Sequence, residues 1–230
     1  MLEFLQVQEL AILRFAHILA MVYWLGGEWA VFQTSYKVVD PALTVPERVR
    51  HLDTVFRIYV VSRIGIVSLL PLGLHMGHLW GVQPYGGNFL VGVWLVWALW
   101  VFITLMAFRD KMSRKRTLWG TLEDWSRYIA IPALIGTGLS SLLGMGPFEA
   151  GEGQQWYSAK VIVFGLSMIV GLVLRFYLHE WPGIFARLAK GPSAEAEARL
   201  AELIRKARVT AVVYWITIGL AGFLGATKPF

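Results

Sequence analysis

Three histidines of this chain stand in apolar surroundings, where an ionisable side chain is uncommon. His17 lies within the apolar run LRFAHILAMVYWLGG, and His75 and His78 belong to LHMGH. The last two are three residues apart, so they share one face of a helix. Neutral imidazole is the commonest ligand for transition metals and also binds haem iron. The spacing predicts a metal or haem site with His17 as one ligand and His75 or His78 as the opposite one.

Two basic residues accompany the predicted ligands. Arg14 precedes His17 by about one helical turn, and Lys160 lies at the start of a later apolar segment. A guanidinium pairs well with a carboxylate, so Arg14 could bind a propionate or another acidic group. Lys160 could bind a second one. The alternative for Lys160 is that its amine reaches the outer headgroups while its alkyl stem stays in lipid.

A further polar pair is predicted deeper in the chain's apolar segments. Glu28 stands near the end of the first segment, and Arg63 lies inside the second. A charge inside hydrocarbon is costly unless it has a partner of opposite sign. We therefore expect a Glu28–Arg63 ion pair between these two segments. Its expected role is structural, with a place on a proton path as the alternative.

The elements that carry these residues have the composition of membrane-spanning helices. The chain has 230 residues, of which 57% are hydrophobic and 16% charged, with a mean hydropathy of +0.57. A soluble domain usually has about 25% charged residues. The 11 tryptophans agree with a membrane protein, because Trp is enriched at bilayer interfaces. The absence of cysteine excludes a disulfide, a thiolate metal site, an iron–sulfur cluster and covalently attached haem.

Six segments are long and apolar enough to span a bilayer, which takes about 20 residues each. The expected fold class is an all-α, polytopic membrane helical bundle with six transmembrane helices in a single domain. The predicted helices cover residues 7–32, 58–80, 89–108, 128–146, 156–178 and 209–226. Residues 193–206 predict an additional amphipathic cytoplasmic helix. It would be a solvated extension of the last span or, alternatively, a partner-binding element.

The loops between the predicted spans alternate in charge. Residues 36–57, 109–127 and 179–208 are rich in Lys and Arg, whereas 81–88 carry no charge and 147–155 carry two acids. Lys and Arg concentrate in cytoplasmic loops. We therefore expect both termini on the outer, periplasmic side of a bacterial cytoplasmic (inner) membrane. The same rule accounts for the net charge of +6, so the expected partner is the lipid bilayer and not nucleic acid.

This topology predicts that the candidate ligands lie at one depth. Successive helices run in opposite directions, and each advances about 1.5 Å per residue. The outer half of the bilayer then receives five polar residues from three helices: Arg14, His17, His75, His78 and Lys160.

Four short motifs, in their order along the chain, resemble the HemJ-type protoporphyrinogen oxidases and related CopD-like membrane proteins. LRFAHILAMVYWLGG is similar to the first helix of that family, in which a His is followed seven residues on by Trp and then by glycine. The other motifs are Arg127 with Pro132, the run WYSAK that ends at Lys160, and the terminal KPF of residues 228–230. The resemblance covers somewhat over half of the chain.

The resemblance implies that His17 is an axial ligand of b-type haem, with Lys160 and Arg127 as supporting residues. It also implies oxidation of a protoporphyrinogen-like substrate and assembly as a homo-oligomer. Two departures stand out. Ser158 occupies a position where the family has a His, and the hairpin of the second and third predicted helices is an insertion. That hairpin carries His75 and His78, which could replace the lost ligand.

The leading prediction is a b-type haem membrane redox protein that transfers electrons or oxidises a hydrophobic substrate near the outer leaflet. Its partner would be a quinone or a periplasmic electron carrier. No residue identifies a catalytic acid or base, so an oxidoreductase activity stays open. The alternative is a CopD-like copper-binding or copper-transport protein, in which Met76 joins the three histidines in a nitrogen and sulfur site. A second alternative is a structural subunit of a larger membrane complex.

Overall fold

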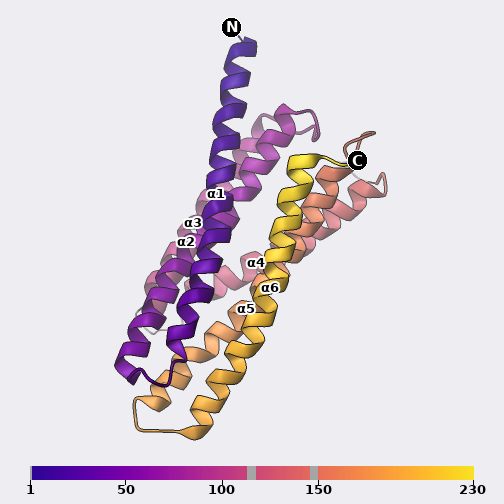
Figure 1. The fold of residues 1–230 in the computed structure, drawn as a ribbon. Helices are drawn as coiled ribbons and strands as arrows, with labels where there is room; N and C mark the ends of the chain where they lie inside the picture. The colour runs from indigo at the N-terminus through magenta and orange to yellow at the C-terminus, as the bar shows by residue number, and fades with distance from the viewer. Residues whose placement is uncertain (1, 113–117, 146–149) are drawn as a thin grey trace.

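The computed structural model describes residues 2–112, 118–145 and 150–230. Within these ranges the chain forms six long α-helices that run along one elongated bundle, with both termini towards the same end (Figure 1). The helices are α1 (Leu2–Val38), α2 (Val45–Leu79), α3 (Asn88–Met112), α4 (Leu118–Leu142), α5 (Gln155–Leu188) and α6 (Ala194–Thr227).

Five of these helices are long and apolar enough to cross a membrane. The candidate spans are Val7–Val38, Val45–Leu79, Asn88–Arg109, Gln155–Leu188 and Ala194–Thr227. Large apolar side chains on their outer faces are exposed, and Leu95, Val96 and Leu99 of α3 are each more than half exposed. A row of exposed aliphatic side chains fits contact with lipid, where it carries no cost. The architecture is an all-helical bundle of an integral membrane protein.

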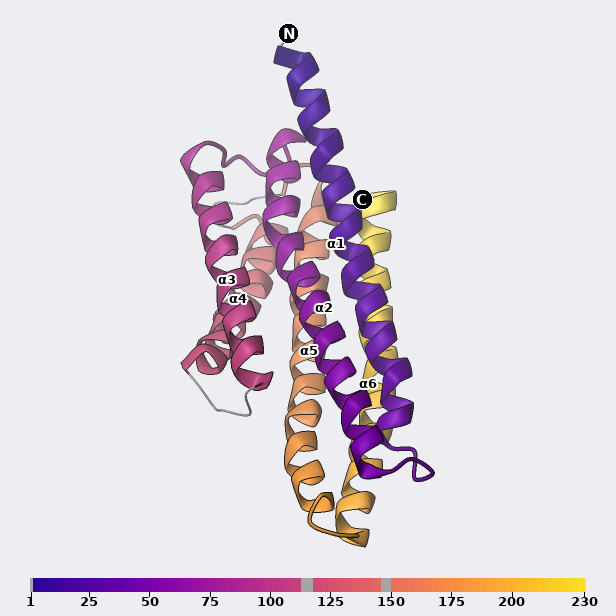
Figure 2. The same ribbon diagram turned by 90° about the vertical axis from the view of Figure 1, so that its left-hand side faces the viewer.

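Four of the helices are longer than a bilayer requires. The 34 residues of α5 extend about 51 Å at 1.5 Å per residue, against a hydrocarbon core about 30 Å thick. Figure 2 shows that α3 and α4 cover the part of the bundle nearer the termini, while α1, α2, α5 and α6 continue past them. The predicted ranges 58–80 and 156–178 stop short of these extensions, because only the apolar stretch of each helix was counted.

The extension has a hydrophobic core of its own. Its fully buried members come from all four helices: Val38, Val55, Leu200 and, at 1–2% exposure, Trp181, Ile184, Leu203 and Ile204. The segment predicted as an amphipathic helix is the first part of α6. Ser193 caps it, since its Oγ accepts a hydrogen bond from the backbone N–H of Ala196 at 3.3 Å. The segment is continuous with the last predicted span within α6, and its Leu200 and Leu203 are buried and not solvated.

A close backbone contact joins α1 to α2. A Cβ added at Gly65 would lie 2.7 Å from the carbonyl oxygen of Ala20 and 2.9 Å from the backbone nitrogen of Trp24. Small residues at such crossings let membrane helices approach closely. On the other side, the indole Nε1 of Trp24 donates to the hydroxyl of Tyr214 on α6 at 2.8 Å. The first helix is thereby fixed against both of these neighbours, which sets the position of His17.

Candidate functional site

A cavity of about 760 Å³ opens among the helices in the half of the bundle nearer the termini. Residues of α1, α2, α4, α5 and α6 line it, together with Phe89 of α3. Its volume lies in the range of sites that bind cofactors and other small organic molecules. Most of its wall is apolar, and polar groups occupy a few positions. The cavity is therefore the first place to look for the predicted ligands.

His17 lies in the wall of this cavity and is partly buried. Its Nδ1 is buried and makes no hydrogen bond to any described residue. A buried polar atom without a partner costs about 1–3 kcal/mol. Gly73 on α2 faces the ring, because a Cβ added there would stand 3.8 Å from Cε1 of His17. The imidazole thus retains an unused polar atom beside a space that a ligand could fill.

Three cations line the same cavity: Arg14, Lys160 and Lys228. Lys160 acts electrostatically on His17, and its amine packs so tightly on Gly225 that an added Cβ would collide with it. Trp80 lies between the other two, with Arg14 5.8 Å and Lys228 4.2 Å from its ring. Among the described lining residues there is no carboxylate. The site is therefore suited to an anionic ligand.

Uncharged polar groups also line the cavity, among them several hydroxyls and the amide of Gln83. Ser141 on α4 and Ser158 on α5 are buried and share a hydrogen bond of 2.7 Å between their Oγ atoms. Tyr157 donates to the carbonyl oxygen of Gly73 at 3.3 Å. Ser158 is the position at which the resemblance to the HemJ-type proteins would lead one to expect a His. In this chain the position pairs two helices through hydroxyls and offers the cavity no imidazole.

The two histidines of α2 lie outside the cavity wall, which corrects the expected convergence. His75 accepts a hydrogen bond from the indole of Trp94 at 3.3 Å, and its Nε2 lies 3.2 Å from a carboxylate oxygen of Glu9. His78 packs against Gly86 in the loop after α2. The depth of these residues was deduced from topology, but depth does not fix the face of the helix on which a side chain projects. Neither residue lines the cavity that His17 lines.

The residues of the copper alternative, His17, His75, Met76 and His78, do not all line one cavity. Among the residues that the structure describes, no group of three or more His, Cys, Asp or Glu side chains is placed to hold a metal ion. Met76 lines the cavity, whereas His75 and His78 on either side of it do not. In the structure, Met76 therefore points into the cavity, while His75 and His78 lie outside its wall.

A second polar centre lies at the other end of the apolar layer. Glu123 on α4 accepts from three arginines: Arg63 of α2 at 2.7 Å, Arg127 of α4 at 2.8 Å and Arg175 of α5 at 2.8 Å. Arg175 also lies 2.5 Å from Asp124. All but Asp124 are buried. We call these five residues the inner charge cluster.

The inner charge cluster corrects two predictions. Arg63 pairs with Glu123 and not with Glu28, whose Oε1 instead accepts a hydrogen bond of 2.7 Å from Ser62. Arg127, which the resemblance places beside a haem, is a member of this cluster and does not line the cavity. The error has one physical source. A buried guanidinium can pair with any acid that lies at the same depth in the bundle. Which acid is near depends on which helices pack together, and the position of a residue in the sequence does not reveal that.

Sequence reasoning did not identify Lys228 or Tyr157 as members of the site. Lys228 follows the end of α6, adopts a left-handed backbone with φ 48°, and lines the cavity. Its ammonium also lies 5.2 Å from the ring of Trp156. The sequence could have indicated the role of Lys228, because cations stack on indole rings and Trp residues are expected near the same membrane surface.

Fold and site together define an all-helical membrane protein with a cationic cavity among its helices. Comparison of the chain with protein-family models, with curated proteins and with solved structures yields no match. The class of protein is thus supported by the helices and the cavity alone.

Proposed function

We propose that this protein binds haem b in the cationic cavity and acts as a membrane redox protein, passing electrons or oxidising a hydrophobic substrate. One observation carries the proposal. A partly buried imidazole with an unpaired nitrogen, His17, shares a large cavity with three cations and, among the described lining residues, no carboxylate. The flat apolar macrocycle of haem suits the apolar cavity wall, and its two propionates suit the three cations.

The residues present fit this group. His17 would ligate the iron, since neutral imidazole is a common haem ligand. Arg14 and Lys160 would bind the propionates through charge-assisted hydrogen bonds. The His17 ring and the Lys160 amine pack against Gly73 and Gly225, which have no side chain of their own to displace them from the cavity wall. Bound haem b would supply one-electron chemistry at its iron. The chain itself would hold the group, neutralise its acids and exclude water with an apolar wall.

The proposal includes six spans with both termini outside the cytoplasm. α4 is not among the five candidate spans and carries both acids of the inner charge cluster. These two acids, Glu123 and Asp124, are paired with arginines inside the bundle. Arg63 lies 16 residues before Leu79, the end of α2, and Arg175 lies 20 residues after Gln155, the start of α5. At 1.5 Å per residue these spacings are about 24 and 30 Å, close to the thickness of the hydrocarbon core. The cluster would then mark the inner boundary, and α4 would cross as the other five do.

The absorbance spectrum of the purified protein tests this function. We expect a Soret band and a reduced-minus-oxidised difference spectrum typical of b-type haem in protein expressed with haem supply. His17→Ala is expected to abolish the band, and Arg14→Ala with Lys160→Ala to weaken haem retention. His51→Ala is the matched control, because His51 lies in the extension of α2, away from the cavity.

The outcome that would overturn the proposal is equally definite. Wild-type protein that folds as a monodisperse species but takes up no haem, either in cells or after reconstitution with hemin, would exclude it. A normal Soret band in folded His17→Ala would exclude the ligand assignment.

A further inference from the structure

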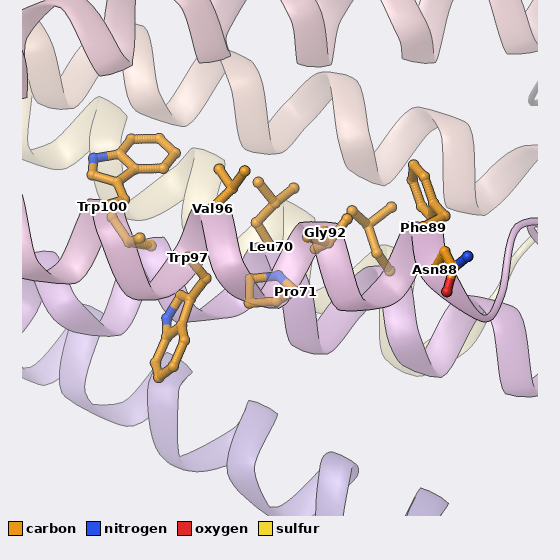
Figure 3. Close-up of a pocket in the computed structure, with 11 residues that line it drawn as sticks. Leu70, Pro71, Asn88, Phe89, Gly92, Val96, Trp97 and Trp100 are labelled. Atoms are coloured by element: carbon orange, nitrogen blue, oxygen red, sulfur yellow. The ribbon is translucent and has the colours of Figure 1, made fainter.

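A second hollow lies on the outside of the bundle, between α2 and α3. It has a volume of about 400 Å³. Figure 3 shows that Asn88 and Phe89 lie at one end of it and Trp100 at the other, with Gly92, Val96 and Leu70 between them. We call this hollow the lateral groove. It opens on the lipid-facing surface, since Val96 in its wall is 59% exposed.

The chemistry of the lateral groove is almost uniform along its length. No charged side chain is found among its described lining residues, and the amide of Asn88 is the polar group at its outer end. Trp100 at the inner end is buried. Trp100 follows Asn88 by 12 positions, which corresponds to about 18 Å of helix. The groove therefore fits a long apolar chain that starts at a small uncharged polar head near the outer surface.

The lateral groove and the cationic cavity share part of their walls. Leu70, Leu74 and Phe89 line both spaces. A molecule in the groove and one in the cavity would therefore contact the same three residues. Leu74 also directly follows Gly73, the residue that faces His17. The groove and the His17 ring thus lie at neighbouring positions of α2.

We infer that the lateral groove binds an uncharged lipid-soluble carbonyl compound of the isoprenoid quinone class. The quinone ring lies at the outer end, where a ring carbonyl accepts from the amide of Asn88 and the ring packs on Phe89. The isoprenoid tail runs along Gly92 and Val96 towards Trp100. A phospholipid fits less well, because its phosphate seeks cations and the groove offers none among its described residues. The choice of a redox-active occupant rests on the proposed function, whereas the binding itself does not.

Gly92 gives a sharp test of this site. A Cβ added at Gly92 meets no atom within 4 Å, so a larger side chain there fills the groove without displacing the helix. Gly219 on α6 is equally open and lines neither the groove nor the cavity. Gly92→Leu is therefore the blocking variant and Gly219→Leu its matched control. Asn88→Leu removes the polar contact and leaves the groove open.

The measurement is quenching of tryptophan fluorescence by decylubiquinone added to the purified full chain in detergent. We expect saturable quenching in wild type and Gly219→Leu, and a dissociation constant raised at least about tenfold in Gly92→Leu. Asn88→Leu is expected to weaken binding several-fold. Size-exclusion profiles and thermal transitions of all variants establish that they fold.

The results separate this inference from the proposed function. Equal quinone affinity in folded Gly92→Leu and wild type would overturn the groove site. Displacement of the quinone by didecanoylphosphatidylglycerol at similar concentration would show a general lipid site and would overturn the quinone assignment. The Soret band of Gly92→Leu is expected to stay normal, because the groove does not contain His17. A wild-type protein without haem that still binds the quinone would overturn the proposed function and leave the groove site standing.

Discussion

Arg63 on α2 donates a hydrogen bond to Glu123 on α4 at 2.7 Å, and both side chains are less than 10% exposed. The same carboxylate also accepts from Arg127 and Arg175. One buried acid thus holds three cations from three helices, with partial help from Asp124. Since like charges repel strongly away from water, the arrangement depends on Glu123 more than on any one arginine.

Replacing Glu123 with Gln is therefore expected to destabilise the protein strongly. Removing one member of a buried ion pair costs about 3–5 kcal/mol, because the remaining charge is buried without compensation. We expect a large drop in the temperature at which the detergent-solubilised protein loses its monodisperse size-exclusion peak. Glu28→Gln is the matched comparison, since Glu28 accepts a hydrogen bond from Ser62 and has no ion pair among the described residues. Equal effects of the two substitutions would contradict the assignment of partners.

A separate ion pair holds the extension of the bundle together. The buried guanidinium of Arg48 makes two hydrogen bonds to Glu197 on α6, at 2.6 and 2.9 Å, and a third to the carbonyl oxygen of Val38 at 2.8 Å. It thereby ties the α1–α2 turn to the start of α6. Arg48 is 2% exposed, so water cannot replace a lost partner without opening the core beneath it.

Substitution of Glu197 by Gln is expected to cost about 1.5–3 kcal/mol, the usual range for hydrogen bonds to charged groups. Hydrogen exchange should rise first in residues 194–206 and in the α1–α2 turn. Glu195→Gln serves as control, because Glu195 is 88% exposed and lies 4.0 Å from Arg187. Exposed pairs of this kind contribute at most about 1 kcal/mol. Unchanged exchange in the 194–206 region of Glu197→Gln would show that the pair does not stabilise the extension.

The crossing of α1 and α2 predicts the effect of a single methyl group. Gly65→Ala would place Cβ within 3 Å of two backbone atoms of α1, at Ala20 and Trp24. Overpacking of this kind costs about 1–3 kcal/mol, and here it would also shift α1 and the cavity wall. Gly219→Ala meets no atom within 4 Å and should be neutral or stabilising by about 0.5–1 kcal/mol. A Gly65→Ala protein as stable as wild type would contradict the close contact.

Helical order was predictable from the sequence, and side-chain partners were less so. Apolar length fixed where the helices lie, because a bilayer demands about 20 apolar residues per span. It missed the extension around Trp181, where burial comes from neighbouring helices and not from lipid, whereas the helix around Leu200 was predicted from its amphipathic pattern. The grouping of Arg14, His17 and Lys160 at one cavity followed from topology. Lys228 lines the same cavity because the backbone turns after α6. Arg63 pairs with Glu123 because the packing of the helices brings the two side chains together. Spacing along the sequence predicts neither the turn nor the packing.

The positions of His75 and His78 give the last prediction, which concerns the number of histidine ligands. Neither residue lines the cationic cavity, because His75 is engaged by Trp94 and Glu9 while His78 lies against Gly86. A haem held by His17 would therefore not depend on them. We expect His75→Ala and His78→Ala, singly and together, to keep the haem content and the Soret position of wild type.

Redox titration sharpens the same test. A lost axial ligand changes the coordination of the iron and shifts its potential and spectrum, whereas a lost surface contact does not. Unchanged spectra and midpoint potential in His75→Ala and His78→Ala would agree with the geometry of α2. A shifted Soret band in either variant, with normal folding, would mean that the outer end of α2 rotates to deliver a second ligand on haem binding. The α2–α3 hairpin would then supply the second ligand.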